Sequence, residues 1–508
     1  MQARSITART LRRERGQAMA FGLVFLAAGS AALYLAFNAG QLSFAKSKLQ
    51  NTADAAAYSA AVLQARDYNF SAYANRAMVA NQVAVAQMVS LASWSQEMKD
   101  SYTGTSPGQT IVDIFGDQSA IQWNMPKRTG AAVVRMADPI ISKATAIATP
   151  ALGLLISSLS QAQSAYHTAT LTTLPLLADQ IARRNQPDSS VSSGYFFGPR
   201  NLVQVGKWKR FTQQYDARAG QSDRFADVVT DGDTLDGFIK DRGTTTRTMG
   251  HLGSAYKGCK GAFAAFLGLA LTHGGGTQLT QDRSRWQGLD ATDEEGALTC
   301  WWATPAGPVG FVMPLAFSHG RGGAGTGSGS SYVERSGYGS YRNFGGTLLN
   351  PATFIAANLQ YQSGTGSSLD ARSQGLRPYQ ELTAQARPAA GQDDNFNRAP
   401  HITIEVERPG ASLGTSSRLL ADAGRLQQDD KLASNSMRAL ASASAYFIRP
   451  DDRSGLAGRL RSAAQWARAD GRFEYPSLFN PYWQASLTPT TDTEKLAAIA
   501  MQVAGGVP

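Results

Sequence analysis

Two glycine-rich patterns in this sequence resemble known reactive loops, and the first is a candidate nucleophile site. Gly104-Thr105-Ser106-Pro107-Gly108 matches G-x-S-x-G, the sharp turn that exposes a catalytic serine. The oxyanion hole of such a site needs the backbone N–H of the residue after the serine. That residue is Pro107, which carries no N–H. We therefore predict a turn here and no nucleophile.

The second pattern, Gly320-Arg321-Gly322-Gly323-Ala324-Gly325, matches the G-x-G-x-x-G of dinucleotide-binding proteins. That fingerprint lies between a strand and a helix, whose N-terminus holds the pyrophosphate. An apolar stretch, residues 310–317, precedes the match, but glycines and serines at residues 326–331 follow it and disfavour a helix. We predict no cofactor here, and a flexible glycine-rich loop over residues 319–346.

Other residue types that carry chemistry are scattered along the sequence. It contains no H-E-x-x-H pattern and no P-loop, and adjacent acids such as Asp429 and Asp430 would diverge on a helix. Asp117 begins a stretch that lacks the second serine of an Asp-x-Ser-x-Ser metal loop. The five histidines stand alone in the sequence: His167, His251, His273, His319 and His401. We predict that the chain is not an enzyme and has no catalytic residue, metal or cofactor.

The first element of the chain is an uncharged run, Ala18–Phe37. A helix rises about 1.5 Å per residue, so this run spans roughly 30 Å, the thickness of a bilayer's hydrocarbon core. Two alternatives are a cleaved signal peptide, whose apolar core is shorter at about 7–15 residues, and a buried helix of a soluble protein. We predict a retained transmembrane helix over residues 17–38.

Charges on either side of this run indicate its orientation. Only two lysines, Lys46 and Lys48, follow it closely. Five arginines precede it: Arg4, Arg9, Arg12, Arg13 and Arg15. Because basic residues favour the cytoplasmic side, we place residues 1–16 in the cytoplasm and the bulk of the chain in the periplasm. The net charge of +10 includes no run of five like charges, and an exported chain does not meet nucleic acid, so we predict no nucleic-acid partner.

Both cysteines, Cys259 and Cys300, fall in the part predicted to be exported. An isolated pair in an oxidising compartment often forms a disulfide. The alternative is two free, buried thiols. A zinc site is disfavoured because the sequence lacks C-x-x-C spacing.

The rest of the chain divides by composition. Residues 39–188 are rich in alanine, leucine and glutamine, which favours a helical stalk or bundle. Residues 189–508 contain more aromatic residues, glycines and β-formers, which indicates a mixed region. The predicted fold class is α+β, mostly α, with a long N-terminal transmembrane helix that continues into an alanine-rich helical bundle.

Periodicity predicts the elements within these regions. Apolar residues recur at three- and four-residue steps over residues 42–63, which predicts one very long helix with a break near residues 67–71. A second helix is predicted over about residues 127–184, broken or kinked by its three prolines. Alternation over residues 401–407 predicts a half-buried strand. Three further helices are predicted near Asp429–Phe447, Ser454–Ala469 and Thr493–Val503.

Two short motifs flank the apolar run. Arg15-Gly16-Gln17-Ala18 precedes it, and Leu49-Gln50-Asn51-Thr52-Ala53-Asp54-Ala55-Ala56-Ala57 follows it. In this order and spacing, over about residues 12–60, they resemble the N-terminal region of TadE/TadG-like proteins of tight-adherence (Flp) pilus assembly. Residues 475–484, YPSLFNPYWQ, are similar to a segment of long members of the same group.

The resemblance implies a single-pass protein of the bacterial inner membrane whose partners are other pilus assembly proteins. We also expect self-association through the N-terminal helix. Prepilin-like members have a glycine cleavage site with glutamate five positions on, but here Phe21 stands five positions after Gly16. That glutamate would neutralise a neighbour's buried N-terminal amine in a filament, so an unprocessed anchor fits better. A pseudopilin-like filament subunit and a periplasmic cell-wall-modifying enzyme remain as alternatives.

Overall fold

The structure is a computed structural model in which the chain divides into two compact units. The first unit comprises Met1–Phe70, Tyr166–Gln213 and Leu382–Pro508, and the second comprises Ser71–Ala165 and Gln214–Glu381. The fold is α+β and mostly α, as predicted. The structure describes residues 15–103, 119–192, 194, 198–216, 224–240, 242, 245–253, 260–280, 282–326, 367–370, 375–383, 386, 398–412, 436–448 and 475–505.

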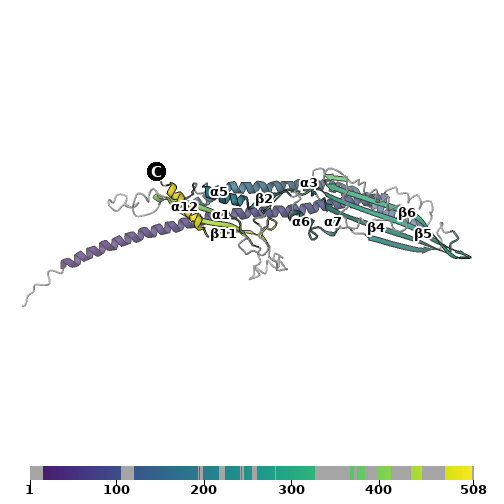
Figure 1. Cartoon of the computed structure of the whole chain (residues 1–508), viewed down its shortest axis with the longest axis horizontal. Helices are drawn as coiled ribbons and strands as arrows, with labels where there is room; N and C mark the ends of the chain where they lie inside the picture. Colours follow the sequence, from purple (N-terminus) through teal and green to yellow (C-terminus); the bar gives the residue numbers. More distant parts are fainter. Residues whose placement is uncertain are drawn as a thin grey trace, which may run out of the picture. The chain divides into compact units, whose positions relative to one another are not determined.

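Two long helices contribute to both units. Helix α1 (Arg15–Thr103) is one unbroken coil, drawn in purple in Figure 1, so the predicted break near residues 67–71 is wrong. Side chains there bond to other elements instead of interrupting the helix, as Asn69 does with the backbone of Trp483. Helix α3 (Ser119–Asn185) also continues through Pro139, Pro150 and Pro175, the three prolines of the predicted range, because each proline removes only one backbone hydrogen bond from a long, alanine-rich helix. The predicted breaks therefore do not occur.

The first unit is built on a four-stranded antiparallel sheet in the order β1-β9-β10-β11. Alanines of α1 pack against this sheet and form its core with aromatic residues such as Tyr68 and Trp483. Small side chains let the helix backbone approach the strands closely. The elements of this unit are β1 (Ser190–Val191), α5 (Pro199–Lys209), β9 (Ile402–Pro409), the 3-10 turn Gly410–Ser412, β10 (Ser436–Phe447), β11 (Trp483–Thr488) and α12 (Asp492–Gly505).

Two predictions for this sheet need correction. The predicted strand at residues 401–407 is confirmed as β9, but it is buried on both faces, since Thr403 and Glu405 are as buried as Ile404. The predicted helix Asp429–Phe447 is wrong over its described part, because residues 436–447 form strand β10. Pairing with β9 and β11 outweighs the helix propensity of its alanines. The predicted helix near Thr493–Val503 is confirmed as α12, whereas Ser454–Ala469 lies outside the described residues.

The second unit contains a five-stranded sheet in the order β3-β4-β5-β6-β7, whose long strands β4, β5 and β6 lie side by side in Figure 1. Strand β6 includes residues 319–326, so the start of the predicted glycine-rich loop is strand; residues 327–346 lie outside the described part. The elements here are α6 (Arg224–Thr230), α7 (Gly237–Lys240), β3 (Thr245–Gly253), β4 (Ala264–Leu279), β5 (Trp286–Thr304), β6 (Gly307–Thr326) and β7 (Ser367–Asp370). The short strands β2 (Thr212–Tyr215) and β8 (Tyr379–Leu382) contain points where the chain passes between the units.

Candidate functional site

The N-terminal end of α1 is apolar and exposed. No residue from 18 to 44 is buried, and large side chains there, such as Phe25 and Leu33, are each 74% exposed. The first buried residue of the helix is Ala45. At about 1.5 Å per residue the exposed end is roughly 40 Å long, close to the thickness of a bilayer with its headgroups. This end of α1 therefore has the length and surface of a membrane-spanning segment.

Two described helices are long and apolar enough to cross a membrane. The most apolar window of α1 has none of its residues buried and lies near the N-terminus, whereas 17% of the corresponding window of α3 is buried. Length and composition alone do not separate a membrane anchor from a signal sequence or a core helix. The N-terminal apolar helix is thus consistent with an anchor or a signal.

The motif that follows the apolar end begins where α1 enters the core. Leu49 is fully buried, and Gln50 donates hydrogen bonds to Asp54 and to the backbone oxygen of Leu440 in β10, both at 3.0 Å. Asn51 is exposed, and Asp54 is partly exposed. The motif thus has one face that fixes the helix on the sheet and another that faces outward.

Amide side chains farther along α1 continue this attachment. The Gln64 amide donates to the Pro400 oxygen at 3.2 Å and accepts from the Ala445 N–H at 3.0 Å. Asn69 forms the same two-way contact with the backbone of Trp483, at 2.9 and 3.0 Å. Trp483 belongs to the YPSLFNPYWQ segment and packs edge-on against Tyr68 with ring centroids 4.8 Å apart. The YPSLFNPYWQ segment is therefore in contact with α1 at Tyr68 and Asn69, shortly after the motif.

A buried histidine–aspartate hydrogen bond lies beside this contact. His167 of α3 meets Asp67 of α1 with 2.5 Å between Nδ1 and Oδ2, and the Asp67 side chain is 1% exposed. Burial raises the pKa of Asp67, although the hydrogen bond from His167 acts in the opposite direction. Burial, together with the neighbouring Asp67, also raises the pKa of the Tyr68 hydroxyl well above its usual range. The pair links α1 to α3 inside the first unit.

The first unit also contains an open cavity of about 1010 Å³ between α5, residues 398–401 and the start of α12. Lys207, Arg210 and Arg398 line it, and His401 lies 2.6 Å from the Glu494 carboxylate. Burial alone would raise the pKa of Glu494, but hydrogen bonds from His401 and from threonines lower it to about 2. Glu494 also accepts from the Thr491 N–H at 2.9 Å, which completes a capping box at the start of α12. Its carboxylate therefore holds α12 in place and stays ionised.

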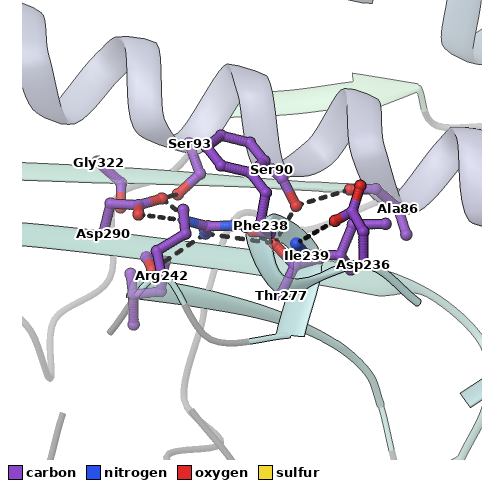
Figure 2. Close-up of polar contacts among 11 residues, drawn as sticks. Ala86, Ser90, Ser93, Asp236, Phe238, Ile239, Arg242, Thr277, Asp290 and Gly322 are labelled. Atoms are coloured by element: carbon purple, nitrogen blue, oxygen red, sulfur yellow. Dashed lines mark hydrogen bonds and ion pairs between the residues drawn. The ribbon is translucent and has the colours of Figure 1, made fainter. Parts of the chain in front are cut away.

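In the second unit, a second buried cluster joins α1 to the sheet (Figure 2). Asp290 of β5 receives two hydrogen bonds from Arg242, at 2.5 and 2.8 Å, and one from Ser93 of α1 at 2.5 Å. Ser90 donates to Thr277 at 2.7 Å. The side chains of Arg242 and Asp290 are 3% and 0% exposed. Both oxygens of the Asp290 carboxylate bond to Arg242, and the cluster is closed to solvent, so we interpret it as a structural link.

The close approach of α1 to strand β6 explains why residue 322 is a glycine. A Cβ added to Gly322 would lie 2.0 Å from the Ser93 oxygen and 2.3 Å from the Glu97 nitrogen. Gly322 belongs to the G-x-G-x-x-G match, and here it lies within strand β6. Its lack of a side chain serves helix–sheet packing in this structure.

Only some of the other residues singled out from the sequence are among those that the structure describes. Arg15, Gly16 and Gln17 lie in the first turn of α1, whereas Arg12 and Arg13 lie outside the described residues. Cys300 is fully buried in β5 and is bonded as a disulfide cysteine. Cys259 lies outside the described residues, so the pairing of the two remains a prediction. Within the described part of the chain, no group of three or more His, Cys, Asp or Glu residues could hold a metal ion.

Comparison with known proteins gives one match. Residues 16–65 match the family described as putative Flp pilus-assembly TadE/G-like. The match covers the exposed end of α1 and the motif that follows it, which agrees with the resemblance drawn from the sequence. No curated protein and no solved structure matches the chain.

Most of the buried polar contacts could not be predicted from the sequence. Asp67 with His167, and Arg242 with Asp290, each join residues that are distant in sequence, so no local spacing marks them. The Gln64 and Asn69 amides offered a signal, because they interrupt an otherwise apolar helix face at core positions.

Proposed function

We propose that the chain is a single-pass protein of the bacterial inner membrane that serves Flp pilus assembly or surface attachment without catalysing a reaction. The observation that carries this proposal is the continuity of α1. Its exposed apolar end and its buried motif belong to one unbroken helix, which changes from exposed to buried at Ala45. Such a helix holds the folded unit at a fixed distance from the membrane. The TadE/G-like match over the same residues supplies the link to the pilus machinery.

A retained anchor fits this helix better than a cleaved signal. A cut between residues 18 and 44 would fall inside continuous helix, whereas signal peptidase needs an extended segment after a short apolar core. With the basic residues at its start, the helix would leave its N-terminus in the cytoplasm and the bulk of the chain in the periplasm. Other pilus assembly proteins are then the expected partners. The outward-facing residues of the motif helix, such as Asn51 and Tyr58, are available to contact them.

The second candidate function is that of a pseudopilin-like filament subunit. The exposed apolar end of α1 is compatible with this function too. Such an end can be buried among its copies in a filament as well as in lipid. Phe21, at the place of the glutamate, speaks against this arrangement because a new N-terminal amine would lack its neutralising partner. Self-association of the N-terminal helix within the membrane is compatible with the retained anchor.

Mass spectrometry of the chain purified from membranes decides between these proposals. A retained anchor predicts an N-terminus upstream of Arg15, with the chain in the membrane fraction after high-salt washing. A chain that begins at Gln17 would support the filament subunit. A chain that begins after residue 38 would show a cleaved signal and overturn both. Cysteines added at residues 3 and 51 extend the test: only the second should react with a membrane-impermeant maleimide in intact spheroplasts.

Among the described residues, the cavity beside His401 is a candidate place for the enzyme alternative to act. His401→Ala and Lys207→Ala change its lining without removing the Glu494 capping box. We expect both variants to support surface attachment at the level of the unaltered chain. Loss of attachment in variants that still accumulate in the membrane would contradict a purely non-enzymatic role.

A further inference from the structure

The part of helix α3 that lies in the second unit has an unusual distribution of side chains. Its buried face is largely polar, whereas its exposed face is apolar. The buried residues include Thr145, Thr149, Ser160 and Gln163. The exposed residues include Val133, Met136, Ile140, Ile147 and Leu154, which are 61–75% exposed. A helix that merely covered a core would show the reverse.

Polar side chains of this face form hydrogen bonds and an ion pair within the second unit. Gln163 donates to the Ser71 oxygen at 2.9 Å and to Asn75 at 2.7 Å. Ser160 donates to the Pro378 oxygen at 2.6 Å. Lys99 of α1 pairs with Asp138 at 3.0 Å. These contacts fix the rotation of α3, so its apolar face points away from the unit.

The exposed face repeats every seven residues. Val133, Ile140, Ile147 and Leu154 occupy one position of this repeat. Four residues after each of them comes a small side chain: Ala137, Ala144, Ala151 and Ser158. A seven-residue repeat keeps a stripe facing a second helix that supercoils with it, as in coiled coils. We call these eight residues the α3 seam.

We propose that the α3 seam is the contact through which two copies of this chain pair. Its large and small side chains alternate along the helix. The large side chains of one copy can therefore fit into the spaces beside the small side chains of an identical helix. A two-fold pair needs a surface that is complementary to itself, and the seam has this property. From Ala144 to Leu177 the helix contains no Asp, Glu, Lys or Arg, so a second copy brings no like charge to that part of the contact.

A lipid surface is a poorer occupant of the seam. Lipid imposes no seven-residue period, and it gains nothing from a row of alanines that permits close approach of another helix. The proposal concerns a surface of the second unit and does not depend on the pilus function or on the orientation of the anchor.

Cysteine cross-linking of the full chain in native membranes tests the pairing. Ile147→Cys places a thiol in the seam, and Ala146→Cys places one on the same turn, exposed but about 100° around the helix. With a short bismaleimide, Ile147→Cys should give a product of twice the chain mass, and Ala146→Cys should give about a tenfold smaller fraction of it. Equal cross-linking of the two variants would overturn the proposal. So would a reactive Ile147→Cys thiol without any dimer, or a product joined to a chain of different mass.

A second variant separates pairing from folding. Ile140→Glu, added to Ile147→Cys, places a carboxylate in the seam and should lower the dimer fraction about tenfold or more. Because Ile140 is exposed, the thermal unfolding of this variant should match that of the unaltered chain when both are diluted in detergent until they are monomers. An unchanged dimer fraction in the glutamate variant would overturn the proposal. A lowered unfolding temperature of the diluted monomer would do the same, since it would show that residue 140 serves the fold of the single chain.

Discussion

The Arg242–Asp290 pair allows a quantitative test of how α1 is held on the second unit. Asp290→Asn keeps the shape of the side chain but leaves the Arg242 charge buried without its carboxylate. Both side chains are nearly inaccessible, and two hydrogen bonds of 2.5 and 2.8 Å join them. Removal of one partner of such a pair costs about 3–5 kcal/mol. At roughly 2–4 °C per kcal/mol for a unit of this size, the unfolding temperature should fall by about 6–20 °C.

Hydrogen exchange of the full chain in detergent measures this effect where it arises. Peptides from β5 and from residues 86–97 of α1 should lose protection together, because Ser93 bonds to the same carboxylate. The double variant Asp290→Asn/Arg242→Met removes the unpaired charge, so it should be more stable than Asp290→Asn alone. A loss below about 1 kcal/mol in the single variant would refute the reasoning. So would strict additivity in the double variant, since either result would mean that the two charges are not coupled.

Three further predictions concern the attachment of α1 and α12. Gly322→Ala should destabilise the second unit by about 1–3 kcal/mol in chemical unfolding, because its Cβ would meet the α1 backbone, whereas Gly237→Ala, with open space around it, should not. Gln64→Ala should lower the free energy of unfolding by about 2–4 kcal/mol in thermal unfolding, since it leaves the buried Ala445 N–H and the partly buried Pro400 oxygen without their partner, whereas exposed Arg66→Ala should change little. Glu494 has a folded pKa of about 2 and an ordinary value of 4.5, so its stabilisation is present above pH 4.5 and is lost as the pH falls toward 2. In an acid titration followed by circular dichroism, Glu494→Gln should be less stable than the unaltered chain at pH 6 and should show a shallower decline between these values.

The long helices could be predicted from the sequence, but their interruptions could not. Alanine-rich periodicity over tens of residues is a strong local signal, and α1 and α3 follow it. The predicted breaks relied on local weakness at residues 67–71 and at the prolines of α3. At Asn69 the backbone contacts with Trp483 stabilise the helix from outside, and that information lies more than 400 residues away in the sequence.

Strand β10 shows a pattern that composition concealed. Its alanines favour a helix by propensity, but they occur at every second position, Ala439, Ala441, Ala443 and Ala445, and all four are buried. The residues between them include Ser442 and Ser444. This two-residue alternation of alanine with other residues is the period of a strand. The small alanine side chains on that face of β10 leave room for α1 to pack against the strand. The alanine content that suggested a helix at β10 therefore serves the packing of a different helix, α1.

Whether a feature could be predicted depends on how much of its surroundings is local in the sequence. No residue from 18 to 44 in the exposed end of α1 is buried, so its apolar length largely determines what it can do, and the sequence is sufficient. The motif from Leu49 to Ala57 already depends on the sheet, and only its small side chains hint at a close neighbour. Arg242 and Asp290 acquire their role only when β5 and the residues after α7 meet. The α3 seam resembles the anchor in this respect: its period is local, and the structure adds that the contacts of Gln163 and Ser160 turn the seam away from its own unit.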